Sequence, residues 1–251
     1  MVKKSLLAFV AALATATPAI SYADVAFNAG LTSDYRYRGI SQSRLKPALQ
    51  GGVDYTNGPF YAGAWASTIK WVEDAGTIFG FDAGSANVEL DLYGGYKGQI
   101  TKELAYDVGL LAYVYPGNKL GSIAPVLRNA NTTEIYGALT YGPATLKYSH
   151  ALTNTFGNPD SKGSFYLDLS AGFDVGSGVT VTPHIGYQKI KGPYESPATY
   201  TDYSLTVSKD FSGFLVSGAI VGTDADKTWY VAPSGKFLGK TSLVVGVKYN
   251  F

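Results

Sequence analysis

Charged side chains recur at every second position in stretches of this sequence that are otherwise apolar. Asp34, Arg36 and Arg38 show this spacing, and Glu89 and Asp91 repeat it among aliphatic residues. Successive residues of a β-strand point to opposite faces, so the spacing predicts strands with one polar and one apolar face. Carboxylates and guanidinium groups on a shared polar face either line an aqueous path or pair with each other and close it.

We predict that these polar faces line the lumen of a barrel. The predicted lumen-lining residues are Asp34, Arg36, Arg38, Gln50, Asp54, Glu89, Asp91, Tyr93, Lys97, Asp107, Glu134, Lys147, Asp168, His184, Asp202 and Lys248. Both signs of charge are present among them, which predicts weak ion selectivity. Pairing of the two arginines with carboxylates of neighbouring strands is favoured over their binding an anionic solute.

Residues suited to catalysis or metal binding are few. The only histidines are His150 and His184, and there is no cysteine. Ser149 and His150 are neighbours in a predicted strand and therefore point to opposite faces. Asp224 and Asp226 supply two carboxylates, whereas calcium takes six to eight oxygen ligands. We expect no catalytic site, no metal and no cofactor.

The N-terminus has the anatomy of a secretory signal peptide. Two lysines precede an apolar core at Leu6–Ala14, and a small-x-small triplet ends at Ala23. The apolar run is shorter than the roughly 20 residues that a membrane-spanning helix needs. We expect residues 1–23 to be removed and residues 24–251 to form one exported domain. Loss of the two lysines changes the formal net charge from +1 to −1, which gives no electrostatic reason to bind nucleic acid.

Alternation and turn signals predict about twelve strands. The predicted strands are Val25–Arg38, Pro47–Tyr55, Phe60–Lys70, Asn87–Lys97, Leu104–Tyr115, Thr132–Tyr141, Ala144–His150, Ser164–Asp174, Val179–Gln188, Tyr200–Lys209, Phe214–Val221 and Thr241–Phe251. Long connections alternate with short turns, as in bacterial outer-membrane barrels. The predicted fold is all-β: a closed antiparallel up-and-down transmembrane β-barrel. A soluble β-sandwich or a lipocalin-like cup is the disfavoured alternative.

Four details of the strands are open to a direct check. The last strand should close the barrel by pairing with the first, with Tyr249 and Phe251 beside Val25 and Phe27. In the third strand we expect an outward face formed by Tyr61, Trp65 and Ile69. Proline cannot donate to the ladder, so Pro183 predicts a bulge or a missing bond. The register of Phe214–Val221 is left open.

Several motifs resemble a known family. They are SDYRYRGISQ (33–42), PALQGGVDY (47–55), FYAGAWAS (60–67) and ELDLYGGY (89–96). Together they are similar to the TorF-type porins, with Tyr37 where that family often has phenylalanine. The resemblance implies an outer-membrane barrel of Gram-negative bacteria with a porin role. It also implies that Tyr249 and Phe251 belong to a signal recognised by the barrel-insertion machinery.

The favoured function is passive diffusion of small hydrophilic solutes across the outer membrane. The partners would then be outer-membrane lipid, the insertion machinery and the solutes themselves. Barrels of 8 strands are filled by side chains and barrels of 16–18 strands contain a channel, so about twelve strands leave the question open. The alternative is a narrow or plugged barrel with a structural or adhesive role and ligand-binding surface loops. A barrel enzyme acting on lipids is less favoured.

Overall fold

The computed structural model describes residues 24–123 and 126–251, so the signal-peptide prediction lies outside the described residues. The strands are β1 (Asp24–Thr32), β2 (Arg36–Tyr37), β3 (Ile40–Ser41), β4 (Ala48–Asn57), β5 (Phe60–Thr68), β6 (Val88–Gln99), β7 (Leu104–Val114), β8 (Thr132–Tyr141), β9 (Ala144–Ala151), β10 (Phe165–Ala171), β11 (Phe173–Asp174), β12 (Val179–Lys189), β13 (Tyr200–Phe211), β14 (Phe214–Thr223) and β15 (Ser242–Asn250). The helices are α1 (Trp71–Phe79), α2 (Glu195–Ala198) and the 3-10 turn η1 (Leu120–Ile123). Within the described ranges, no helix has the length and apolar character needed to cross a membrane.

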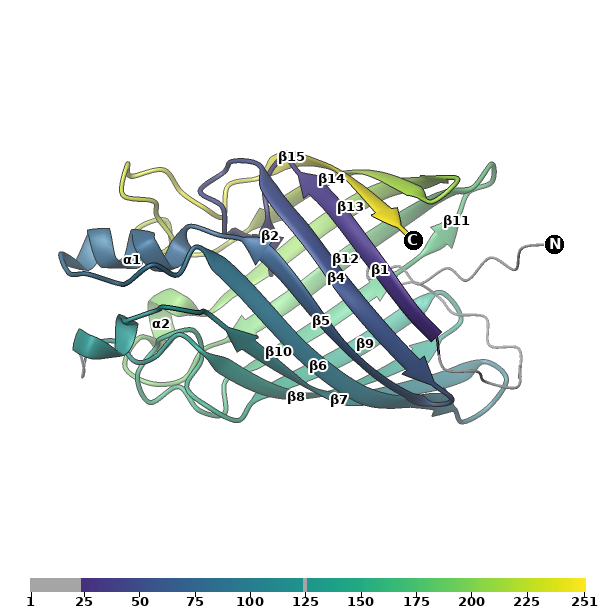
Figure 1. The fold of residues 1–251 in the computed structure, drawn as a ribbon, viewed down its shortest axis with the longest axis horizontal. Coiled ribbons are helices and arrows are strands. Elements are labelled where there is room, and N and C mark those ends of the chain that lie inside the picture. Colours follow the sequence, from purple (N-terminus) through teal and green to yellow (C-terminus); the bar gives the residue numbers. More distant parts are fainter. Residues whose placement is uncertain (1–23, 124–125) are drawn as a thin grey trace.

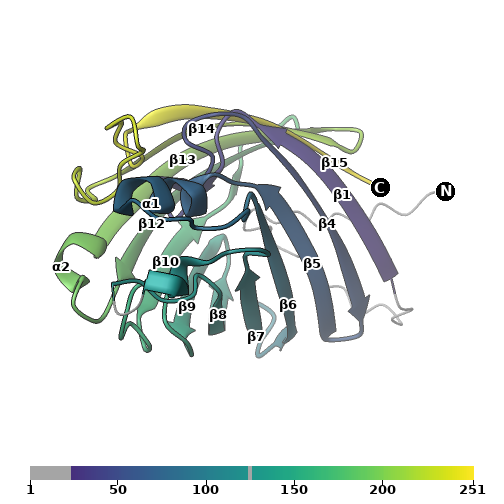
Figure 2. The same cartoon turned by 60° about the vertical axis from the view of Figure 1, so that its left-hand side comes forward.

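The long strands form a closed antiparallel barrel (Figures 1 and 2). Each strand pairs with its neighbour in the chain, β1 pairs with both β4 and β15, and β10 with β12 completes the ring. The short β11 continues β10 after Gly172, so the ring has twelve strands. This confirms the predicted fold class.

The closing pair is the one expected between the two ends of the domain. Phe251 lies beside Phe27 as expected, but the expected place of Tyr249 beside Val25 is wrong, because Tyr249 lies opposite Ala29 and Val247 opposite Leu31. Phe27 and Phe251 exchange two backbone hydrogen bonds of 2.9 and 3.0 Å, and their rings stack with centroids 5.9 Å apart. The ladder therefore continues to the last residue of the chain.

The faces of the strands explain why the chain forms a barrel with an apolar exterior. Leu49, Leu139 and Val245 expose 64%, 48% and 49% of their surface, and most strands carry similar residues at every second position. A soluble protein would bury such a continuous apolar belt, whereas a lipid-facing barrel exposes it. The alternate positions point inward.

Long and short connections gather at opposite ends of the barrel. The helices and long loops lie at the left-hand end in Figure 1, hereafter the loop end, and the tight turns lie at the other. Gly58 and Gly142 sit in two of these turns with φ of 60° and 55°, a left-handed conformation that favours glycine. The alternation predicted from the sequence is confirmed.

The prediction of one strand from Val25 to Arg38 is wrong. Strand β1 ends at Thr32, and the chain then turns into the barrel and forms the small hairpin β2–β3. Arg38 and Gly39 make its turn with φ of 46° and 79°. The alternation of charges continues through the turn, so the sequence pattern gives no sign that the strand has ended.

The outward face expected for the third strand is also wrong. Ile69 is 2% exposed, Trp65 packs against Tyr35 with ring centroids 5.4 Å apart, and Tyr61 bonds to inward groups. The outward positions of β5 hold Phe60 and a run of small residues opposite Leu92 and its neighbours on β6. The large aromatic side chains of this strand, Tyr61 and Trp65, therefore point into the barrel.

Pro183 causes a missing bond and no bulge. Strand β12 pairs with β13 without interruption from Val179 to Gln188. On its other side, Ser170 lies opposite His184 and Phe173 opposite Val181, which is the same register before and after the gap. The break between β10 and β11 therefore falls opposite the proline. The sequence leaves the register of β14 open; in the structure, Leu215 lies opposite Lys248 of β15.

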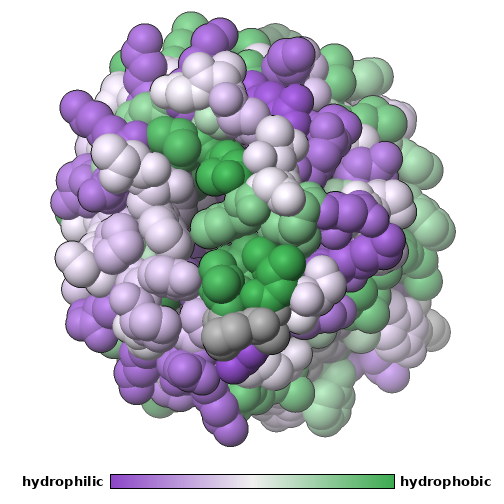
Figure 3. Space-filling view, turned by 90° about the vertical axis from the view of Figure 1, so that its left-hand side faces the viewer, coloured by the Kyte–Doolittle hydropathy of each residue, from purple (hydrophilic) through white to green (hydrophobic). Residues whose placement is uncertain are grey.

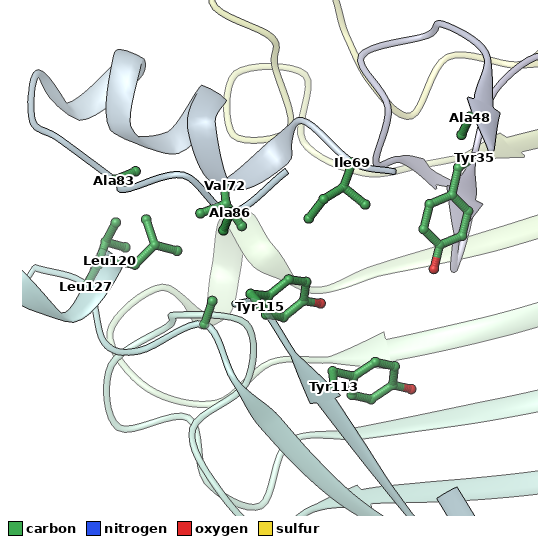
Figure 4. Packing of buried hydrophobic residues seen from close by; sticks show 11 residues of the cluster. Tyr35, Ala48, Ile69, Val72, Ala83, Ala86, Tyr113, Tyr115, Leu120 and Leu127 are labelled. Atoms are coloured by element: carbon green, nitrogen blue, oxygen red, sulfur yellow. The ribbon is translucent and has the colours of Figure 1, made fainter. Parts of the chain in front are cut away.

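Buried apolar residues concentrate at the loop end of the barrel. One cluster joins helix α1, the 3-10 turn and the ends of β5 and β7. Figure 4 shows Val72, Ala86 and Ile69 next to the ring of Tyr115. A second cluster joins Ile40 of β3 to the last long loop. The loops are therefore packed against one another at this end.

Candidate functional site: a constricted lumen

The hairpin β2–β3 and its flanks, residues 33–46, lie inside the barrel at the loop end; we call this segment the inner hairpin. Its base follows β1, and its tip reaches the opposite wall. The Arg38 guanidinium donates to Glu134 of β8 over 2.7 Å and to Gln188 of β12 over 2.5 Å. Because β8 and β12 flank the wall opposite β1 in the ring, the inner hairpin crosses the lumen.

Arg38 is enclosed by aromatic rings as well as by acceptors. Its guanidinium carbon lies 4.8 Å from the centroid of Tyr37 and 4.3 Å from that of Tyr166. The side chains of Arg38 and Glu134 are 6% and 2% exposed. Removing one member of such a buried pair leaves the other charge without compensation, which is strongly destabilising. This contact is the main anchor of the hairpin tip.

The base of the inner hairpin is held by a second ion pair. Arg36 Nε donates to Asp34 over 2.5 Å, and the same carboxylate accepts from the hydroxyls of Ser41 and Ser43 at 2.5 and 3.1 Å. Arg36 also donates to backbone carbonyls of the hairpin and of the last long loop, including that of Leu238 over 3.1 Å. The hairpin is therefore attached to the wall and to a neighbouring loop.

Tyrosine hydroxyls link the middle of the hairpin to a buried carboxylate. Tyr35 and Tyr115 both donate to Glu89, the latter over 2.8 Å. Burial raises the pKa of Tyr35 well above its ordinary value, so the phenol keeps its proton and remains a donor. Tyr37 donates to Tyr113 over 2.6 Å. Figure 4 shows Tyr35 on the hairpin and Tyr113 and Tyr115 on the facing wall.

A second layer of polar contacts lies nearer the short turns. Tyr61 of β5 donates to Asp107 of β7 over 2.5 Å, and Tyr93 of β6 donates to Asp54 of β4 over 2.5 Å. Each contact joins strands that are separated by another strand, so both must lie on the concave face. Lys147 lies 4.0 Å from the ring centroid of Tyr136 on the adjacent strand.

The wall formed by β10, β12 and β13 carries the one histidine of the interior. His184 Nε2 lies 2.7 Å from Asp168, and its Nδ1 lies 3.7 Å from Asp202. Tyr166 donates to Asp202 over 2.9 Å. His150 instead contacts Tyr148, which is exposed on the outer face. Within residues 24–123 and 126–251, no group of three or more histidine or acidic side chains could hold a metal ion.

The structure brings many of the predicted lumen residues into these layers, with three displaced from the wall. Asp34, Arg36 and Arg38 belong to the inner hairpin, so they fill the lumen and do not line β1. Asp91 is half-buried in the wall, and one of its carboxylate oxygens is covered and has no hydrogen-bond partner among the described residues. Lys248 lies opposite Gly30 of β1, at an inward position of β15. Whether any of these residues selects a solute stays a prediction.

Much of the aromatic lining lies outside the predicted set of lumen residues. The missed residues that hold the hairpin or the wall are Tyr35, Tyr37, Trp65, Tyr113, Tyr115, Tyr166 and Gln188. A usable signal exists for Tyr113, Tyr115 and Tyr166, because they share parity with Asp107 or Asp168 of their own strands. Tyr35 and Tyr37 alternate with the charged residues around them and carry no such signal. An amphipathic phenol can point inward when its hydroxyl finds an acceptor there.

Side chains cover most of the loop end of the barrel. Viewed from that end, apolar side chains gather in the middle of the face and hydrophilic ones surround them (Figure 3). The lumen is thus narrowed both by the inner hairpin and by the loops above it.

Outside the strands, Glu73 of α1 accepts a hydrogen bond from Lys70, and this bond holds the pKa of the Glu73 carboxyl below its usual range.

Comparison with known proteins identifies a family and a fold. A family described as bacterial protein of unknown function (Gcw_chp) matches residues 15–251. No curated protein shows a significant match. The match does not name the TorF-type porins, so that finer resemblance stays a prediction.

Two solved structures share the whole fold. The COG4313 outer membrane channel from Pseudomonas putida F1 has a TM-score of 0.54 and 10% identity, over 96% of this chain and 98% of that chain. The NanC porin has a TM-score of 0.53 and 9% identity, over 91% of this chain and 99% of that chain. OprD from Pseudomonas aeruginosa is more distant, with a TM-score of 0.40 and 14% identity, and this chain covers 66% of it. At these identities the likeness establishes the barrel fold.

Proposed function

The chain belongs to the Gcw_chp family, and we propose that it forms a constricted outer-membrane channel for the passive diffusion of small hydrophilic solutes. The observation that carries the proposal is the contrast between the two faces of one closed barrel. The outer face is an apolar belt, and the inner face carries ion pairs, phenols and amides. An interior of this kind is what a hydrated path requires, whereas a barrel filled for stability alone can use apolar side chains.

The inner hairpin limits what such a channel could pass. Arg38 joins the hairpin to the opposite wall through Glu134 and Gln188, which divides the cross-section at the loop end. Solutes would have to move beside the hairpin, so only small ones are expected to pass. Since the tip combines a cation with buried carboxylates, selectivity for ion charge should be weak.

Other features support the outer-membrane location. Two solved barrels with this fold are named as an outer membrane channel and a porin. The motifs at 33–42 and 47–55 resemble TorF-type porins, and the N-terminus resembles a signal peptide for export to the periplasm. The terminal Tyr249 and Phe251 would be read by the insertion machinery, and the apolar belt would contact outer-membrane lipid. We expect no nucleic-acid partner and no enzymatic activity.

Planar-bilayer recording on the mature barrel tests the channel function. The protein, residues 24–251, is refolded in detergent, and its folded state is verified by heat-modifiable migration on a gel. We expect steady, small conductance steps. A preparation that is fully heat-modifiable and yet silent in the bilayer would reject the channel.

The second candidate is a closed structural or adhesive barrel. The network at Arg38 favours it, because every anchor of the hairpin also blocks the lumen. The apolar residues that gather on the loop end in Figure 3 would then serve surface binding. A silent barrel whose loop end binds cells or matrix components would support this alternative over diffusion.

A further inference from the structure

A cavity of about 240 Å³ lies inside the barrel at the base of the inner hairpin. Its lining includes Thr32 of β1, Asp34 and Arg36 of the hairpin, Gln50 of β4, Trp65 of β5 and Val244 of β15. The strand neighbours Leu49 and Leu243 are 64% and 69% exposed on the outer face, so Gln50 and Val244 face inward. The cavity therefore belongs to the lumen and not to the lipid surface.

Arg36 borders this cavity and has one buried donor without a partner among the described residues. Its side chain is 5% exposed. Nε is bonded to Asp34 and Nη1 to backbone carbonyls, while Nη2 has no hydrogen-bond partner among the described residues. Buried donors of folded proteins are nearly always paired, by protein groups or by something bound. Nη2 has almost no accessible surface, so a hydroxyl in the cavity reaches it only when the Arg36 side chain shifts.

The charge of the lining favours a neutral occupant. Asp34 and Arg36 form an ion pair of 2.5 Å and cancel each other, so the wall carries no net charge to match an ion. Thr32 contributes a hydroxyl oxygen that can accept, since its proton is donated to the Asp34 carbonyl, and Gln50 contributes an amide that can both donate and accept. A charged solute would lose its hydration without gaining an opposite unpaired charge.

The remaining lining is apolar and flat. The indole of Trp65 is held edge-on by Tyr35, with an interplanar angle of 65°, and Val244 faces the same space. Pockets for drug-sized ligands are larger, roughly 300–1,000 Å³. An aromatic ring beside several hydrogen-bonding groups suits a compact ring whose faces are apolar and whose edge carries hydroxyls.

We infer that this cavity binds a small neutral polyhydroxylated solute, of the size of a monosaccharide, at the base of the inner hairpin. The inference rests on the proposed channel function, for which it names the class of solute. Arg36 and Gln50 would bond to hydroxyls, and Trp65 would contact the apolar face of the ring. The site would hold the solute beside the constriction that it has to pass.

Ligand-observed NMR titration of the folded mature barrel with D-glucose tests the site, with glucuronate and glucosamine as charged probes of similar shape. We expect D-glucose to bind more tightly than either charged probe. Trp65→Leu should weaken glucose binding about tenfold, the scale of one aromatic contact. Trp229→Leu, in the last long loop and away from the cavity, should leave binding unchanged. Equal binding by wild type and Trp65→Leu, or tighter binding of a charged probe, would overturn the inference.

Gln50→Ala and Thr32→Val provide a second test that does not depend on a large side chain. Each should weaken glucose binding while heat-modifiable migration stays normal; unchanged binding in both would also reject the site. Bilayer recording separates the two proposals. A barrel that conducts but does not bind glucose rejects the site and keeps the channel. A barrel that binds glucose with the expected specificity but never conducts rejects the channel and keeps the site.

Discussion

At the scale of single residues, the contacts of Arg38 determine how firmly the inner hairpin is held. The guanidinium has an ionic partner in Glu134, an amide partner in Gln188 and two aromatic rings beside it. Tyr37 is its neighbour in sequence, whereas Glu134, Gln188 and Tyr166 are all distant from it. Closure of the barrel therefore brings these groups around Arg38. A substitution of Arg38 tests both the closed fold and the constriction.

Arg38→Gln should lower the free energy of unfolding by about 3–5 kcal/mol, because Glu134 stays buried without its partner. The double variant Arg38→Gln, Glu134→Gln should recover much of that loss, since two amides can bond to each other. Urea unfolding of the refolded barrel in lipid vesicles measures both. Lys70→Gln, at an exposed ion pair on α1, is the matched control and should have no measurable effect. If the single and double variants lose equal stability, the buried pair is not the anchor.

At the scale of elements, an inward tyrosine is packed over a glycine of a neighbouring strand at several places in the barrel. At Gly186 of β12, an added Cβ would lie 1.9 Å from the hydroxyl oxygen of Tyr166 on β10. Tyr166 also backs Arg38 and donates to Asp202. Because Gly186 has no side chain, the Tyr166 ring can lie against it in the position where it contacts Arg38 of the inner hairpin.

Gly186→Ala should lower the free energy of unfolding by about 1–3 kcal/mol, the usual effect of overpacking. Gly218→Ala on β14 is the matched control, because nothing lies within 4 Å of its added Cβ. Both variants replace glycine by alanine within a strand of the same barrel. Urea midpoints measured side by side decide the comparison. A loss at Gly218 as large as that at Gly186 would show that the cause is not the tyrosine.

The inner hairpin is the element that limits passage. Replacing residues 35–41 by a short glycine-serine linker should increase single-channel conductance several-fold, because the segment that crosses the lumen is gone. Replacing residues 192–197, which include most of α2, by a similar linker is the control and should leave conductance near the wild-type value. Heat-modifiable migration must be retained in both. Unchanged conductance without the hairpin would place the constriction elsewhere.

How far the elements could be predicted depended on whether hydrophobicity marked the outer face. It did in β6, where Leu92 stands between Asp91 and Tyr93, and at the end of β15, where Val247 and Tyr249 alternate with Lys248 and Asn250. It did not in β5, because the outer face carries small side chains and the inner face carries Trp65. The hairpin could not be predicted either. Strand β1 ends at Thr32, but Arg36 and Arg38 continue the alternation of charged residues that is typical of a strand. Contacts such as Arg38 with Glu134 join residues far apart in sequence, and only the closed ring shows them.

At the scale of the whole molecule, closure depends on the two ends of the domain meeting. Phe251 exchanges two backbone hydrogen bonds with Phe27, and its ring lies between those of Phe27 and Tyr249, with centroids 5.9 and 5.7 Å away. The same side chain would be part of the signal for barrel insertion. The structural role and the signalling role can be separated, because one acts on the folded barrel and the other acts before folding.

Phe251→Ala should strongly reduce the amount of folded barrel in the outer membrane of growing cells, while the purified barrel refolded in detergent loses only about 0.5–1.5 kcal/mol of stability through the missing ring contacts. Leu243→Ala is the matched control, because Leu243 is an exposed apolar residue of the same strand at the loop end. It should assemble in cells like the wild type. Heat-modifiable migration of membrane fractions measures assembly, and urea unfolding measures stability. Normal assembly of Phe251→Ala in cells would remove the signalling role, and a large loss of stability in vitro would show that closure itself requires the ring.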